Sequence, residues 1–207
     1  GGGGDWAVQG DAGLAWLLMI AAMMLPTALP LFEAFDRLAA GRPDRPRLLF
    51  LVGLGYIAAW AGFGVAAHAL HGLLLETVDG IPLLARHAWL IGAATIAGAG
   101  AFQFSRLKHL CLDKCRTPLS FVIEHWRGRQ QARQAFVLGA HHGLFCVGCC
   151  WALMLLMFVV GAGNLGWMLL LAALMSIEKN LPWGRRLSAP LGFALLGWAA
   201  LLVALRA

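Results

Sequence analysis

Three cysteines, two histidines and two methionines lie within one apolar stretch, residues 139–157. The cysteines are Cys146, Cys149 and Cys150, and His142 precedes the first of them by four residues. At about 100° per residue, a helix places His142, Cys146 and Cys149 on one stripe with Cys150 beside it. A single buried cysteine usually behaves as a small hydrophobe. Three within five positions instead indicate a metal or redox site, with His142 as a further candidate ligand.

A second pair of thiols, Cys111 and Cys115, lies nearer the middle of the chain. Their spacing puts both on one helix face, a common geometry for two ligands of one metal. Two unrelated thiols are the alternative, and a cytoplasmic disulfide is disfavoured because that compartment is reducing. The pair either completes the Cys146 site or forms a second site. A shared site requires residues 111–118 to fold back among the membrane helices, where protein must cover their backbone.

A stripe of five residues at helical spacing follows the cysteine stretch and ends in a carboxylate: Asn164, Met168, Leu171, Met175 and Glu178. This spacing predicts that the stripe faces the interior of a helix bundle. A carboxylate at the end of a membrane helix needs a partner. Lys179, or an arginine of the following loop, is the simplest partner for Glu178, and a proton or metal role is the alternative.

The composition indicates an integral membrane protein. The chain has 207 residues, of which 60% are hydrophobic and 13% are charged, whereas a soluble domain carries about a quarter charged residues. The net charge of +6 comes from basic residues in short loops beside apolar segments. Membrane topology explains these residues better than nucleic-acid binding does, so no nucleic-acid partner is expected.

Six apolar segments are candidate membrane crossings, the fifth of them short: residues 12–35, 48–75, 82–104, 135–160, 164–177 and 187–205. Pro26 and Pro30 should kink or break the first, and the glycines of the second suit close helix packing. Pro118 should divide residues 105–134 into two short helices, the second at the membrane interface. We therefore expect an all-α polytopic membrane bundle. It would form one integral membrane domain over residues 1–207, with residues 1–11 as a flexible start and residues 105–134 as a cytoplasmic or interfacial segment.

The loop charges predict an orientation. The loops after the first, third and fifth segments carry 4, 7 and 3 Lys or Arg residues, and the opposite side carries only Arg86 and Arg206. By the positive-inside rule, the basic loops are cytoplasmic and both termini lie outside the cytoplasm. The expected location is the bacterial inner membrane, with lipids as neighbours and a membrane-protein partner or a second copy of the chain as further partners.

Several motifs stand in a fixed order along the chain: Ala22-Met23-Met24-Leu25-Pro26 with Pro30, Cys111-x-x-x-Cys115-Arg116-x-Pro118, Cys146-x-Gly148-Cys149-Cys150-Trp151, and Asn164-x-x-Trp167-Met168 followed by Glu178-Lys179-x-x-Pro182-x-Gly184. In these motifs the chain resembles a bacterial family of predicted metal-binding integral membrane proteins whose function is unassigned. The resemblance covers most of the chain, and the Cys-x-Gly-Cys-Cys-Trp motif is its most specific part. It implies metal binding by the cysteines, with His142 as a further candidate, and supplies no reaction.

The leading functional hypothesis is a non-enzymatic membrane protein that handles a soft cation, by transport, delivery or sensing. Copper(I) is favoured because thiolate and thioether ligands select it, and zinc or iron are the other candidate metals. The alternatives are an accessory or redox subunit of a larger membrane enzyme complex, and a thiol oxidoreductase. Burial of the thiols in mid-membrane opposes the last alternative, because it raises the thiol pKa unless a metal is bound.

Overall fold

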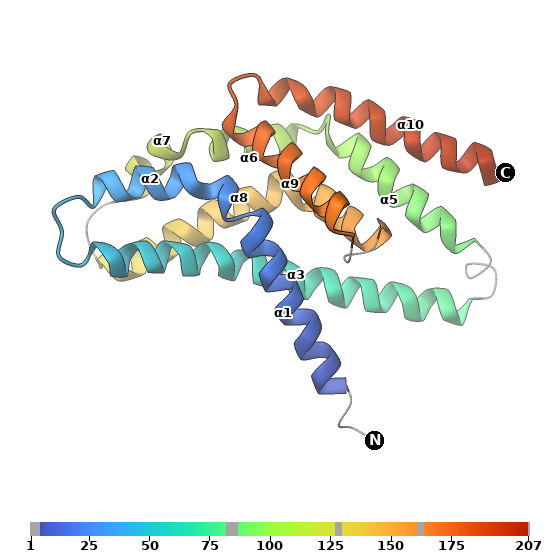
Figure 1. Cartoon of the computed structure of the whole chain (residues 1–207), viewed down its shortest axis with the longest axis horizontal. Helices are drawn as coiled ribbons and strands as arrows, with labels where there is room; N and C mark the ends of the chain where they lie inside the picture. The colour runs from blue at the N-terminus through green and yellow to red at the C-terminus, as the bar shows by residue number, and fades with distance from the viewer. Residues whose placement is uncertain (1–4, 82–86, 127–129, 161–163, 207) are drawn as a thin grey trace. The chain divides into compact units, whose positions relative to one another are not determined.

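The computed structural model describes residues 5–81, 87–126, 130–160 and 164–206, and every regular element in these ranges is helical (Figure 1). The elements are α1 (Asp5–Met23), η1 (Pro26–Ala28), α2 (Leu29–Leu38), α3 (Arg45–Gly80), α5 (Ala88–Phe102), α6 (Arg106–Arg116), α7 (Pro118–His125), α8 (Gln131–Val160), α9 (Leu165–Asn180), η2 (Gly184–Leu187) and α10 (Ser188–Arg206). The predicted all-α class is confirmed.

The chain forms two compact units. The first contains residues 1–64 and 117–145, and the second contains residues 65–116 and 146–207. Two boundaries between the units fall inside helices. One lies between Gly64 and Val65 in α3, and the other lies between Phe145 and Cys146 in α8. The single integral membrane domain stays a prediction.

The proline pair of the first unit interrupts the first apolar segment, as predicted. The helix α1 ends at Met23, a short 3-10 turn begins at Pro26, and α2 follows at an angle of 41°. A break of this kind leaves backbone carbonyls without helical partners. The Met24 carbonyl accepts hydrogen bonds from the hydroxyls of Thr27 and Tyr56, at 2.8 and 3.1 Å.

Glycines allow helices of the first unit to approach closely. A Cβ atom at Gly55 of α3 would overlap the backbone of Phe136 in α8, and one at Gly139 would overlap the backbone of Val52. A Cβ atom at Gly64 would overlap the indole of Trp16. The predicted role of glycine in the second segment is thus confirmed at Gly55 and Gly64.

The helices α2 and α7 lie side by side in the first unit (Figure 1). Phe35 of α2, Val52 of α3, Phe121 of α7 and Leu138 of α8 belong to one cluster of buried apolar side chains. Phe35 also meets Trp126 edge-on, with ring centroids 5.0 Å apart. This core holds the short α7 in place against longer helices.

The helices α5 and α10 are neighbours in the second unit, and they run side by side in Figure 1. A Cβ atom at Gly100 of α5 would lie 3.1 Å from the carbonyl oxygen of Gly192 in α10, so little space separates the two backbones. Within residues 105–134, α6 ends at Arg116 and α7 begins at Pro118, which confirms the predicted pair of short helices. Their depth in a membrane stays a prediction.

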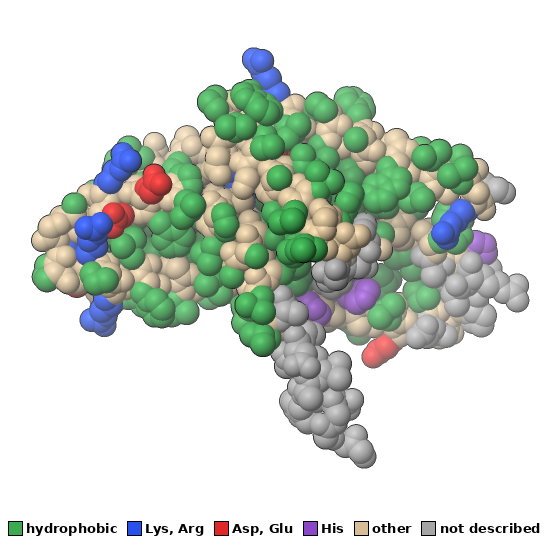
Figure 2. Space-filling view, viewed as in Figure 1, with side chains coloured by type: hydrophobic (Ala, Val, Ile, Leu, Met, Phe, Trp, Pro, Cys, Tyr) green, Lys and Arg blue, Asp and Glu red, His purple; other side chains and the backbone are tan. Residues whose placement is uncertain are grey.

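Three helices of the described residues are long and apolar enough to cross a membrane: 45–78, 131–157 and 184–206. The bent pair formed by residues 16–23 and 26–38 raises this number to four if it counts as one crossing. Figure 2 shows hydrophobic side chains over much of the visible face, as expected for helices in contact with lipid. The apolar part of α5, residues 89–102, is shorter, and α9 has 16 residues. Six crossings are therefore not confirmed.

Candidate metal centre

Four thiols of the second unit gather between α6 and α8. The Sγ atom of Cys115 lies 3.9 Å from that of Cys149, and the Sγ atoms of Cys149 and Cys150 are 3.4 Å apart. Cys115 also interacts with Cys146. All these side chains are buried, and the sulfurs are too far apart for a disulfide bond of about 2.05 Å. The structure thus brings the second predicted thiol pair to the first cluster, through Cys115.

The close approach of α6 to α8 depends on Gly148. A Cβ atom at this position would lie 2.6 Å from the Sγ atom of Cys111, well inside van der Waals contact. The side chain of Cys111 therefore packs against Gly148, which lies between Cys146 and Cys149 in the sequence. Its burial raises the pKa of the Cys111 thiol above the usual value.

The side chain of Lys179 contacts the cluster from α9. Its Nζ atom donates to the Sγ atom of Cys146 at 2.8 Å, and both side chains are buried, with 5% and 1% exposure. A buried ammonium needs a hydrogen-bond partner, and the Cys146 sulfur is one such partner for Lys179. This contact makes Cys146 the thiol of the cluster with a cation directly beside it.

A buried ion pair lies between α6 and α9. Lys108 donates to both carboxylate oxygens of Glu178, at 2.8 and 2.9 Å, and Ser188 donates to one of them at 2.7 Å. Lys108 also donates to the side-chain oxygen of Gln103. Lys108 and Glu178 are 0% and 1% exposed. The predicted need of Glu178 for a partner is confirmed, but Lys108 is the partner and Lys179 contacts a thiol.

Backbone contacts tie α6 to the end of α9. Arg116 donates to the carbonyl oxygens of Glu178 and Pro182, the second at 2.9 Å. Arg185 pairs with Asp113 at 3.1 Å on the exposed side. The consecutive residues Glu178 and Lys179 are therefore held in register with α6.

The predicted inward stripe of α9 is correct for part of its length. Leu171, Met175 and Glu178 are buried, and Met168 is half-buried. Asn164 is exposed and caps the helix, because its side-chain oxygen accepts from the backbone N–H of Trp167 at 3.0 Å. The prediction that Asn164 faces the interior is wrong, since an asparagine just before a helix satisfies its unpaired N–H groups.

His142 belongs to the first unit, whereas the thiols belong to the second. Its buried ring lies edge-on to Phe121, with centroids 5.3 Å apart, and its centroid is 6.3 Å from that of Tyr56. The role of His142 as a ligand stays a prediction.

No group of three or more His, Cys, Asp or Glu side chains in the described part of the chain is placed to hold a metal ion. The thiol cluster therefore offers a metal pairs of sulfurs rather than a closed cage. A metal–sulfur bond of about 2.3 Å lets two sulfurs on opposite sides of an ion lie up to about 4.6 Å apart. The separation of 3.9 Å between Cys115 and Cys149 falls within this reach.

Residues 13–202 match the model of the PpoB2 family, which is described as a copper chaperone. The chain belongs to this copper chaperone family. No curated protein and no solved structure matches it.

Membership of the copper chaperone family gives the chain a copper-related function, in agreement with the metal favoured by the sequence. Copper(I) is a soft ion that prefers thiolate and thioether ligands. The described residues contain such donors grouped at one place, the contact of α6 with α8. The donor chemistry of this place therefore matches the cargo of the family.

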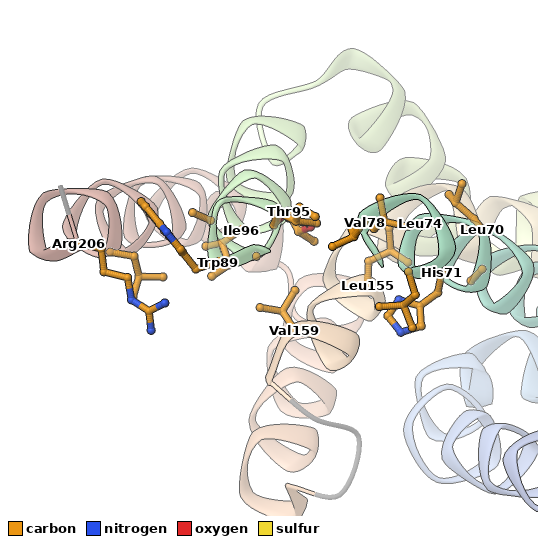
Figure 3. Close-up of a pocket in the computed structure, with 16 residues that line it drawn as sticks. Leu70, His71, Leu74, Val78, Trp89, Thr95, Ile96, Leu155, Val159 and Arg206 are labelled. Atoms are coloured by element: carbon orange, nitrogen blue, oxygen red, sulfur yellow. Dashed lines mark hydrogen bonds between the residues drawn. The ribbon is translucent and has the colours of Figure 1, made fainter. Parts of the chain in front are cut away.

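The second unit also contains a cavity, and none of the thiols is among the residues that line it (Figure 3). It has a volume of about 540 Å³, and its walls come from α3, α5, α8 and α10. Leu74, Val78, Ile96 and Val159 are typical of its lining. None of the described residues that line this cavity is a cysteine or a methionine, so the cavity is not a candidate copper site.

The sequence did not reveal that Lys108 pairs with Glu178 or that Lys179 contacts Cys146. Both lysines were counted among the basic residues of cytoplasmic loops, yet both are buried. One signal was available in the sequence: Lys108 falls three residues before Cys111, so a helix places it one turn before the thiol. The contact of Lys179 with Cys146 joins residues 33 positions apart and has no local signature.

Proposed function

We propose that this protein is an integral membrane copper chaperone that carries Cu(I) on thiols from α6 and α8. The observation that carries the proposal is the distance of 3.9 Å between the Sγ atoms of Cys115 and Cys149, which come from different helices. Cys146 and Cys150 extend the same cluster, and Cys111 lies beside it against Gly148. Family membership supplies the identity of the metal.

Pairs of sulfurs suit a carrier better than a closed site does. Copper(I) is stable with two or three soft ligands, whereas structural zinc sites are closed and tetrahedral. A cluster of several thiols can pass Cu(I) from one pair to the next, because each new bond can form before an old one breaks. Several thiols without a closed cage thus favour release to a recipient.

The proposed membrane arrangement keeps the six predicted crossings, with the basic loops in the cytoplasm and both termini outside. The positive-inside distribution of Lys and Arg supports it. In this arrangement α5 and α9 cross as short helices, and the bent pair of α1 and α2 crosses once. Lipids surround the bundle, and a membrane-bound recipient of copper is the expected partner.

The experiment compares copper binding by the purified full chain and by Cys146→Ser/Cys149→Ser. The proteins are loaded with Cu(I) without oxygen, desalted and subjected to elemental analysis. We expect the double variant to lose the bound copper, because each remaining thiol lacks its neighbour. Ala152→Ser is the matched control, since it adds a hydroxyl at a buried position of α8 and keeps every thiol. Unchanged copper content in the double variant would overturn the proposal.

A further inference from the structure

We propose that the cavity of the second unit is a lipid-binding site, which takes one acyl chain of an anionic phospholipid and holds the phosphate group beside Arg206. This site is separate from the proposed copper site, because none of the thiols lines the cavity. The volume of about 540 Å³ falls within the usual range of ligand pockets, about 300–1,000 Å³. The space is therefore large enough for a hydrocarbon chain.

The cavity begins where four helices of the second unit have their ends. Each helix contributes a lining residue from a terminal turn, namely Val78 of α3, Trp89 of α5, Val159 of α8 and Arg206 of α10. Along α3 the lining continues inward from Val78 to Ala67, a length of about 16 Å at 1.5 Å per residue. The cavity thus runs along the helices, as an acyl chain in a membrane would.

The terminal end of the cavity carries a cation and an aromatic ring. The guanidinium carbon of Arg206 lies 5.8 Å from the centroid of the Trp89 ring. Two of the apolar helices that could cross a membrane, 45–78 and 184–206, end here. Tryptophan and arginine near the ends of membrane helices lie at the level of the lipid headgroups. This end of the cavity therefore places a positive charge at the depth of a lipid phosphate.

The rest of the lining suits hydrocarbon. In Figure 3, Arg206 and Trp89 lie on one side of the cavity, and leucines of α3 lie on the other. Ile96 and Leu155 are typical of the walls between them. The hydroxyl of Thr95 donates to the carbonyl oxygen of Ile91 at 2.8 Å, so this polar group is satisfied within α5. An acyl chain therefore meets mainly apolar side chains.

The charge at the terminal end favours an anionic lipid over a zwitterionic one. The side chain of Arg206 is exposed, and no carboxylate of the described ranges forms an ion pair with it. No described residue of the lining is acidic. A zwitterionic headgroup brings its own cation, which Arg206 repels, whereas the headgroup of phosphatidylglycerol has a net negative charge. Charge complementarity thus points to the second kind of lipid.

The first test asks which lipid binds and where. Phosphatidylglycerol or phosphatidylcholine with the same acyl chains is added to the full chain in a neutral detergent, and native mass spectrometry measures the bound lipid. Phosphatidylglycerol with a diazirine on its acyl chain then locates the site by cross-linking. We expect a preference for phosphatidylglycerol and cross-links to lining residues such as Ile96, Leu155 and Val159. Equal binding of both lipids, or cross-links confined to other surfaces, would overturn the proposal.

The second test removes the charge. Arg206→Gln should lower the preference for phosphatidylglycerol by about fivefold, as befits one cation beside an anionic headgroup. Arg206→Lys should keep the preference. Arg186→Gln is the matched control, because it removes an exposed positive charge near the other end of the same helix, 184–206. An unchanged preference in Arg206→Gln, or an equal loss in Arg186→Gln, would overturn the assignment of the phosphate to Arg206.

The third test fills the cavity. Ala67→Phe occupies the inner part and Val159→Trp occupies the terminal part, so each should reduce both the binding of phosphatidylglycerol and the cross-linking. Val159 is partly exposed at the end of α8, so its substitution decides the test if thermal unfolding shows that Ala67→Phe does not fold. Undiminished lipid binding by folded Val159→Trp would overturn the proposal. Elemental analysis of the same samples should show unchanged copper, since the thiols lie elsewhere.

Discussion

Glu178 and Lys179 are consecutive residues of α9 whose side chains reach different helices. Glu178 accepts from Lys108 of α6 at 2.8 Å, and Lys179 donates to Cys146 of α8 at the same distance. Successive residues of an α-helix point about 100° apart. The end of α9 can therefore hold an ion pair on one side and a thiol on the next.

Removal of the carboxylate should destabilise the second unit. Glu178→Gln leaves the buried ammonium of Lys108 without its counter-charge, and loss of one partner of a buried pair costs about 3–5 kcal/mol. We expect a clear fall in the thermal unfolding temperature in detergent. Lys108→Met/Glu178→Met should recover much of the loss, because replacement of both partners by apolar side chains is often neutral.

Asp113→Asn is the control for that experiment. It removes one carboxylate from an exposed ion pair with Arg185, whose side chains are 54% and 47% exposed for Arg185 and Asp113. Exposed pairs contribute at most about 1 kcal/mol. Equal effects of Glu178→Gln and Asp113→Asn would show that the buried pair adds no special stability.

The contact of Gly148 with Cys111 predicts a compensating pair of substitutions. Gly148→Ala places a methyl group against the Cys111 sulfur, and overpacking of this kind costs about 1–3 kcal/mol. Cys111→Ala removes that sulfur, so Gly148→Ala/Cys111→Ala should be more stable than Gly148→Ala alone. The measurement is thermal unfolding of the four proteins, and no recovery in the double variant would contradict this packing.

The proximity of Cys115 and Cys149 can be checked by oxidation. We expect mild oxidation of the metal-free protein to link the peptide with Cys115 to the peptide with Cys149 and Cys150, because their sulfurs need only a small movement to bond. Prior loading with Cu(I) should protect the thiols. Mass spectrometry of the digested protein detects the link, and its absence from metal-free protein would argue against the contact of α6 with α8.

The proposed six crossings predict the side on which reporters appear. Fusions after Ala207 should report the outside, and fusions near Gln130 should report the cytoplasm, since the loop around Gln130 is rich in Lys and Arg. A fusion inserted near Asp44 provides the control, because it lies in another basic loop and should match Gln130. The same side for Ala207 and Gln130 would exclude the three crossings proposed between these two points, and with them the proposed topology.

Local sequence signals predicted much of the helical framework. The helices are interrupted before Pro26 and before Pro118, because proline has no backbone N–H to donate and its ring clashes with the preceding turn. The thiol spacings predicted which cysteines share a helix face, since that depends only on helical geometry. The predicted segment of residues 187–205 agrees with α10 to within one residue at each end.

Tertiary contacts account for what the sequence left open. Lys108 and Lys179 are basic residues near helix ends, and only the neighbouring helices show that they are buried. Asn164 matched a helical stripe by spacing, but its position just before α9 made it a cap. The number of crossings stayed unconfirmed because α5 and α9 are short, with 15 and 16 residues.

The backbone carbonyl of Met24 is where the proline break is connected to the rest of the first unit. Two hydroxyls, from Thr27 in the turn and Tyr56 on α3, supply the hydrogen bonds that a straight helix would have provided. The second bond joins the break to α3, so the angle between α1 and α2 is supported by another helix as well as by the prolines. Met24, whose side chain is buried, is therefore held beside α3 by its own backbone carbonyl.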